Sequence, residues 1–168
     1  MIREIIYAYG HPQIKATHRT TFEVTKEDYV TERGDCIIGV KADKSVKDLS
    51  SEFKNALRDP FAVLVILLET SGKNREIVLA TGAKNLSLTH PSSIVVRKSQ
   101  HVDERTLAIN SNKAAININR NMIKQLQKGE MLKMTLILIT AREYLSNNLI
   151  TEKFLNHRNP QWYEEGGR

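Results

Sequence analysis

Basic side chains and histidines occupy similar points in the first and second halves of this 168-residue chain. Guanidinium and ammonium groups hold phosphate and carboxylate oxygens through charge-assisted hydrogen bonds. We therefore expect an anion-binding site in a basic cleft between the two halves. Its candidate residues are His11, His18, Arg19, Arg33, Asp43, Lys44, Arg97, Lys98, Arg105, Asn112 and Lys113.

The expected positions of these cations explain why they are grouped. Lys44 and Lys113 stand at the predicted starts of two helices, where free backbone N–H groups and the helix dipole favour an anion. Arg33 and Arg105 each precede a predicted strand. If the two halves pack about a twofold axis, all four side chains converge on one cleft.

Acidic residues near the same points add a second kind of chemistry. Asp35, Asp43 and Asp103 are positioned to accept protons or to hold Mg²⁺ beside a bound phosphate. The alternative is structural: Asp35 and Asp103 pair with Arg33 and Arg105 at solvated ends of strands. No other cofactor is evident from the sequence.

The histidines and the single cysteine, Cys36, do not have the spacing of a metal site. The chain has no Cys-x-x-Cys motif and no pair of histidines four residues apart on a helix, so no metal site is predicted. Cys36 begins an apolar strand, a position more typical of a small buried residue than of a nucleophile.

An internal repeat is the main evidence for how these residues are positioned. Residues 3–6 (Arg-Glu-Ile-Ile) return at 75–78 (Arg-Glu-Ile-Val), and His11-Pro12 returns as His90-Pro91. One apolar helical face also recurs 69 positions later. Its residues are Val46, Leu49, Phe53 and Leu57 in the first copy, and Ala115, Ile118, Met122 and Leu126 in the second.

Around each predicted helix the sequence indicates strands. The helices are expected to begin after Asp43 and Asn112, which can cap free N–H groups. An Asx turn further along, at Asp48 or Asn119, is the alternative. Strands are predicted at residues 3–6, 14–24, 36–40 and 61–68, and at 75–78, 94–99, 106–109 and 132–139.

This pattern predicts an α+β fold built from two strand-strand-helix-strand units. We expect one domain at residues 1–145, with repeats at about 1–73 and 74–145, and a C-terminal extension at 146–168. A mixed, barrel-like sheet of the cradle-loop kind is predicted, with an open mixed sheet carrying both helices on one face as the alternative. The Trp162-Tyr163 pair is expected to pack back on the domain or to anchor a partner.

Several phrases resemble an archaeal family known only as domain of unknown function 371. They are His11-Pro12, residues 17–21 (Thr-His-Arg-Thr-Thr) and 33–40 (Arg-Gly-Asp-Cys-Ile-Ile-Gly-Val), with residues 97–99 and 103–108 in the second half. The similarity covers roughly residues 3 to 145. It implies an archaeal cytoplasmic protein and supplies no activity.

Charge and composition limit the class of partner and the compartment. Twenty-five Lys and Arg residues against 19 Asp and Glu give a net charge of +6, which favours anionic partners such as RNA. A single cysteine cannot form an internal disulfide, and the N-terminus lacks a signal pattern, so a cytoplasmic protein is expected. No membrane span is predicted. The sequence does not predict the oligomeric state.

Two functions follow. The first prediction is a binding module whose cleft engages RNA or a ribonucleoprotein, mainly through phosphate contacts. The alternative is an enzyme for a phosphorylated or carboxylated small molecule, with His18 and Asp35 as acid and base. The alternative predicts a concave pocket of limited size rather than an extended basic face.

Overall fold

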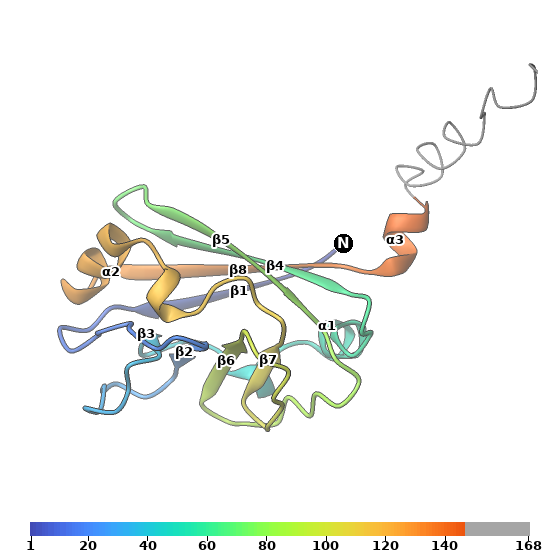
Figure 1. The fold of residues 1–168 in the computed structure, drawn as a ribbon, viewed down its shortest axis with the longest axis horizontal. Coiled ribbons are helices and arrows are strands. Elements are labelled where there is room, and N and C mark those ends of the chain that lie inside the picture. The colour runs from blue at the N-terminus through green and yellow to red at the C-terminus, as the bar shows by residue number, and fades with distance from the viewer. Residues whose placement is uncertain (147–168) are drawn as a thin grey trace, which may run out of the picture.

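Two four-stranded sheets make up the fold of residues 1–146, the part of the chain that the computed structural model describes (Figure 1). The first sheet is antiparallel, in the order β1 (Ile2–Tyr9), β8 (Met131–Ile139), β4 (Val63–Thr70) and β5 (Arg75–Thr81). The second sheet is mixed, in the order β3 (Ile37–Gly39), β2 (Thr21–Thr25), β6 (Ser93–Arg97) and β7 (Thr106–Ala108).

The two sheets stack as layers with the hydrophobic core between them (Figure 1). Along β4 every second side chain is buried, as the strand period of two requires, so Leu64, Ile66 and Leu68 all enter the core. Phe22 and Val24 of β2 enter the same core from the second sheet. The predicted α+β class is therefore confirmed.

The helical segments are shorter than the sequence predicts. Each predicted helix is split into a 3₁₀ turn and an α-helix: η1 (Val46–Asp48) with α1 (Ser51–Leu57), and η2 (Ala115–Asn117) with α2 (Arg120–Gln127). The break lies where Leu49 and Ser50 adopt extended backbone, with ψ of 149° and 150°. The apolar spacing holds because all four predicted residues of each face are buried.

The cap of α2 is Asn119, the predicted alternative, whereas the cap of α1 is Ser50, which was not predicted. The Ser50 hydroxyl accepts from the backbone N–H of Phe53 at 3.2 Å, and the Asn119 amide oxygen accepts from Asn121 N at 2.8 Å. These caps, and not Asp43 or Asn112, begin α1 and α2. A third helix, α3 (Ala141–Ser146), follows β8 and was not predicted.

Asp43 and Asn112 instead hold the edge strands of the first sheet. Asp43 Oδ1 accepts from Tyr7 N on β1 at 2.9 Å, and Asn112 Oδ1 accepts from Leu79 N on β5 at 2.9 Å. The two contacts are alike because β1 and β5 occupy opposite edges of the same sheet.

Two largely buried carboxylates, Glu4 on β1 and Glu76 on β5, make a second pair of matching contacts. Glu4 accepts from Lys44 Nζ and from the backbone N–H of residue 50, each at 2.8 Å. Glu76 accepts from Lys113 Nζ and from the backbone N–H of residue 119. Each carboxylate thus joins an edge strand to the segment that begins the next helix.

The described strands do not close into a barrel. Isolated antiparallel bridges, Tyr9 with Val40 and Thr81 with Ile109, connect the two sheets at two corners, but the longer ladders do not continue through them. The predicted barrel-like closure is therefore unconfirmed. Within residues 1–146 no helix has the length and apolar character needed to cross a membrane. The predicted packing of Trp162 lies outside the described residues.

Candidate functional site

A polar cavity of about 310 Å³ opens on the face of the second sheet that is turned away from the core. Phe22 and Val24 point into the core, so Thr21 and Glu23, one step out of phase, lie on the cavity side. We call this cavity the arginine pocket. It is lined by His18, Thr20, Thr21, Glu23, Arg33, Asp35, Cys36, Val95, Arg97, Ser99, His101 and Arg105.

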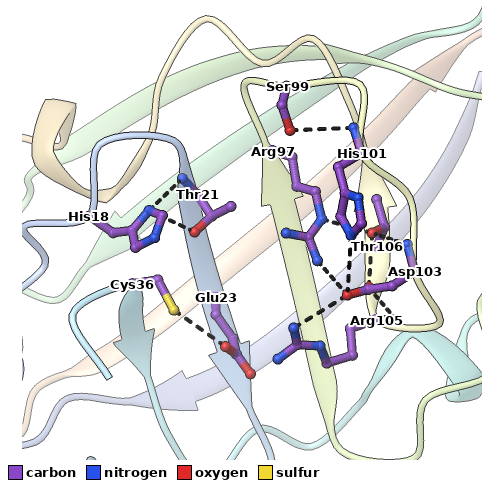
Figure 2. Close-up of polar contacts among 10 residues, drawn as sticks. All are labelled: His18, Thr21, Glu23, Cys36, Arg97, Ser99, His101, Asp103, Arg105 and Thr106. Carbon is purple, nitrogen blue, oxygen red and sulfur yellow. Dashed lines mark hydrogen bonds and ion pairs between the residues drawn. The ribbon is translucent and has the colours of Figure 1, made fainter. Parts of the chain in front are cut away.

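On the β6 side, Asp103 holds two arginines in place (Figure 2). Arg97 Nη2 donates to Asp103 Oδ2 at 2.7 Å, and Arg105 Nη2 donates to the same oxygen at 3.3 Å. Arg97 Nε also donates to the Thr106 hydroxyl at 2.9 Å. Because Arg97 is only 8% exposed, these contacts fix its guanidinium in the wall of the pocket.

The electrostatics of this cluster keep Asp103 ionised. Partial burial raises the pKa of its carboxyl, but the hydrogen bonds from Arg105 N and the Arg97 guanidinium outweigh burial and lower the pKa to about 2. His101 Nε2 lies 4.0 Å from Asp103 Oδ2. A charged Asp103 therefore stands behind the two guanidinium groups that line the pocket at neutral pH.

On the β2 side, Glu23 and Cys36 face each other (Figure 2). The Cys36 thiol donates to Glu23 Oε2 at 3.4 Å. Burial, followed by the negative charge of Glu23, raises the pKa of Cys36 to about 12. Cys36 is therefore a protonated thiol at neutral pH, and a thiol in this state is a poor nucleophile.

Glu23 also faces Arg105 across the pocket. Figure 2 shows the carboxylate and the guanidinium turned toward one another from the two sides. Burial alone would lower the pKa of Arg105, but the charges of Asp103 and Glu23 raise it. Glu23 is 9% exposed, so this wall carries a buried carboxylate opposite the partly exposed guanidinium of Arg105.

His18 lies in a turn that fixes its tautomer. Its Nδ1 accepts from the backbone N–H of Thr20 at 3.2 Å and of Thr21 at 3.1 Å. The neutral ring must then carry its proton on Nε2, which makes it a hydrogen-bond donor. His90 makes the same turn with the backbone N–H groups of Ser92 and Ser93.

The predicted site residues divide between the pocket and other places. Those that line the pocket are His18, Arg33, Arg97 and Arg105, together with the predicted acid Asp35. Lys44 and Lys113 form ion pairs with Glu4 and Glu76 on the first sheet. Asp43 and Asn112 hold strand edges, His11 accepts from Gln13 N, and Arg19 and Lys98 are not among the lining residues.

The matched contacts also change which residues correspond between the halves. His18 shares its turn with His90, so the predicted match of His11 with His90 does not describe the turns. Likewise, Glu23 N donates to Cys36 O and Val95 N donates to Arg105 O, each at 2.9 Å. A cysteine and an arginine thus occupy equivalent places in the pocket walls.

Sequence reasoning missed several lining residues. Glu23 was the most informative omission, because a charged residue between Phe22 and Val24 marks the outer face of a strand. Thr20, Thr21, Val95, Ser99 and His101 were not predicted as site residues either. Their types are common on any surface, so only the fold brings them together.

The arrangement is suited to binding an oxyanion that also carries hydrogen-bond donors. Guanidinium N–H groups, the His18 Nε2–H and threonine hydroxyls can contact phosphate or carboxylate oxygens. The carboxylates of Glu23 and Asp35 can accept from hydroxyl or amino groups of the same molecule. Within residues 1–146, no three His, Cys, Asp or Glu side chains cluster as a metal site requires.

Comparison with known proteins places the chain in a family. The model of a domain of unknown function, DUF371, matches residues 6–139, and the chain belongs to this family. An uncharacterized protein of Methanocaldococcus jannaschii is 47% identical to it over 133 residues, which cover 79% of this chain and 97% of that relative.

Proposed function

We propose that this DUF371 protein binds a small metabolite with a phosphate or carboxylate group in the arginine pocket. The observation that supports this most is the pair of guanidinium groups, Arg97 and Arg105, oriented by the single carboxylate of Asp103. Arginines fixed before the ligand arrives lose little side-chain freedom on binding, which favours affinity.

The size and mixed charge of the pocket favour a small molecule over RNA. A cavity of about 310 Å³ is at the low end of the range for small-molecule sites. Its guanidinium groups share the walls with Glu23 and Asp35, and these carboxylates would repel a continuous phosphate backbone. RNA binding, the first function predicted from the net charge, remains a second proposal that the same experiment tests.

Catalysis in this pocket would have to use its carboxylates rather than Cys36. His18 is a donor through Nε2, so Asp35 is the member of the predicted acid and base pair that can accept a proton from a bound hydroxyl group. Mg²⁺ held between Asp35 or Glu23 and a bound phosphate is the cofactor we would test. Turnover of a bound metabolite would show that the protein is an enzyme and not only a binding protein.

The experiment compares ligand binding by the wild-type chain and an Arg33→Gln variant. Inorganic phosphate, citrate and ribose 5-phosphate are titrated by calorimetry, with and without Mg²⁺, and thermal stabilisation is recorded in parallel. We expect one of these probes to bind and the Arg33→Gln variant to bind about tenfold more weakly, as expected for a lost charge-assisted hydrogen bond.

Arg142→Gln is the matched control, because Arg142 is an exposed arginine on α3 that does not line the pocket. Its affinity should equal that of the wild type. Absence of binding by every small probe, together with RNA affinity that falls steeply with salt, would replace the proposed function with the RNA-binding one. Equal weakening by both variants would indicate a general charge effect instead of a pocket.

We also propose that the chain arose by duplication of one strand-strand-helix-strand unit. The support is the matched hydrogen bonds: Asp43 with Tyr7 against Asn112 with Leu79, and the turns of His18 and His90. Under this proposal the pocket lies where the two units meet, at the β2 and β6 pair. The two units then diverged, since Cys36 in the first stands at the position that Arg105 occupies in the second. The pocket therefore favours one orientation of a bound ligand.

A further inference from the structure

The face of the first sheet that is turned away from the core is largely apolar and partly exposed. We call it the apolar outer face. Its most exposed members are Ile77, at 55% exposure, and Leu79, at 45%. Register places its apolar residues side by side across all four strands: Ile5, Val63, Val65, Leu67, Ile77, Leu79, Ile137 and Ile139. Its polar members are Arg3, which is exposed on β1 beside Ile137, and Thr135, which is 6% exposed in the centre of the sheet. Contiguous apolar surfaces of this kind mark interaction sites.

The described helices do not use this face. The buried side chains of α1 and α2, such as Phe53 and Met122, belong to the core on the other side of the sheet. We infer that the apolar outer face is the interface of a homodimer, in which a second copy of this chain packs its own outer face against the first.

The charges beside the face are complementary to themselves. One row of the sheet reads Tyr7, Lys133, Glu69 and Arg75 across β1, β8, β4 and β5. A twofold axis that runs parallel to the strands, between β8 and β4, packs this row against the same row of the partner, read in the opposite order. Lys133 then faces the partner's Glu69, and Tyr7 faces the partner's Arg75, a cation–π contact.

The same axis brings the more apolar rows together. Leu67 and Thr135 lie on either side of the axis, and so do Val65 and Ile137, so that each meets the other residue of its pair on the partner. At the ends of the second row, Arg3 and Leu79 meet in the same way on the edge strands. Two sheets packed face to face are rotated by about 30°, which displaces the edge strands most and leaves the contacts of β4 and β8 near the axis. The predicted register is therefore set by the central strands.

The area of the face fits a weak dimer. It is four strands wide, and the strands have 8, 9, 8 and 7 residues. With a strand spacing of about 4.8 Å and a rise of about 3.3 Å per residue, the whole outer side of the sheet covers roughly 500 Å². Two such faces bury roughly 1,000 Å², which lies in the range of transient interfaces, below about 1,200 Å². We therefore expect a reversible dimer rather than an obligate one.

Residues 147–168 are the other candidate cover. The family model matches residues 6–139, so residues 147–168 lie outside the matched domain. The whole face lies within that domain apart from its edges, and its self-complementary charges favour a second copy as the cover.

Sedimentation velocity of the full chain across a range of concentrations tests the inference. We expect a monomer–dimer equilibrium, and an Ile77→Lys variant should raise the dissociation constant at least about tenfold, because it buries an unpaired charge. Tyr29→Lys is the matched control, since Tyr29 is 54% exposed and lies between β2 and β3 of the second sheet. This control should dimerise like the wild type.

Charge exchange tests the register. Lys133→Glu should weaken the dimer, and adding Glu69→Lys to it should restore part of the affinity, because residues 133 and 69 again carry opposite charges across the interface while Arg75 loses its ion pair with Glu69. A full chain that remains monomeric at every concentration overturns the inference, and hydrogen exchange showing a protected outer face in that monomer would assign the cover to residues 147–168. A dimer that is unaffected by Ile77→Lys also overturns it.

Discussion

Arg97 donates from Nη2 to Oδ2 of Asp103 over 2.7 Å in a wall where Arg97 is almost fully buried. Asp103→Asn keeps the shape of the side chain but removes the charge that balances both guanidinium groups. We expect it to lower the free energy of unfolding by about 2 kcal/mol, because one partner of a largely buried ion pair is lost.

Urea denaturation of the two proteins at neutral pH measures this change. Asp28→Asn is the control, since Asp28 is an exposed residue outside the cluster, and it should have almost no effect. Equal stability of wild type and Asp103→Asn would mean that solvent, and not Asp103, balances Arg97.

The stability that Asp103 contributes should depend on pH in a defined window. Its pKa is about 2 in the folded chain, against 3.8 for an ordinary aspartate. A carboxyl with a lowered folded pKa stabilises the folded state above the unfolded value, and this contribution is lost as pH falls toward the folded value. The difference in unfolding free energy between wild type and Asp103→Asn should therefore be constant above about pH 4 and shrink between about pH 4 and pH 2.

Chemical denaturation at several pH values, carried out on both proteins, isolates this contribution because the other acids titrate in each. A difference that stays the same down to pH 2 would contradict the assignment of the low pKa to Asp103.

The sequence predicted the strands and the buried helical faces, but not the extended break that divides each helical segment into a 3₁₀ turn and an α-helix. The spacing of Val46, Leu49, Phe53 and Leu57 is right because burial needs only the correct side of the backbone. It does not show that Leu49 and Ser50 are extended, since a 3₁₀ turn followed by an α-helix buries the same residues. Capping by Ser50 was therefore missed.

The pocket was only partly predictable for a related reason. Matching short phrases of sequence made His11 the equivalent of His90, whereas the hydrogen bonds that each ring accepts from the backbone make His18 its equivalent. The alternative, structural interpretation paired Asp103 with Arg105, and these two residues do form an ion pair. The approach of Glu23 to Arg105 depends on the pairing of β2 with β6, which no local pattern specifies.

Cys36 should react slowly with alkylating reagents in the folded chain. A rise in its pKa from 9.0 to about 12 lowers the thiolate fraction near neutral pH about a thousandfold. Glu23→Gln should speed the reaction, because removal of the adjacent negative charge lowers the pKa of the thiol. Mass spectrometry of iodoacetamide adducts over time gives both rates, and the urea-unfolded chain provides the reference rate. A folded rate equal to the unfolded one would contradict the raised pKa.

Asp43 should act as a structural acceptor and not as a ligand-binding residue. Its Oδ1 accepts from Tyr7 N, and Asn112 makes the same contact with an amide, so Asp43→Asn should leave stability nearly unchanged. Asp43→Ala should cost about 1 kcal/mol, because Tyr7 N loses its partner. Thermal denaturation measures the cost, and calorimetry with the anion probes should show unchanged affinity for both variants. Weaker anion binding by Asp43→Asn would extend the site beyond the arginine pocket.

Two glycines allow each half of the chain to approach the helix of the other half. A Cβ on Gly10 would overlap the backbone carbonyl of Leu126 at the end of α2, and a Cβ on Gly82 would overlap that of Leu57 at the end of α1. Backbone atoms cannot rotate away, so Gly10→Ala and Gly82→Ala should each destabilise the chain by about 1–3 kcal/mol or more. Gly72→Ala is the control, since there the Cβ meets only the amide end of Gln125, a side chain that can move. Urea denaturation should give two large and similar losses against a small one for Gly72→Ala. A loss at only one of Gly10 and Gly82 would show that the two helix contacts are not equivalent in the folded protein.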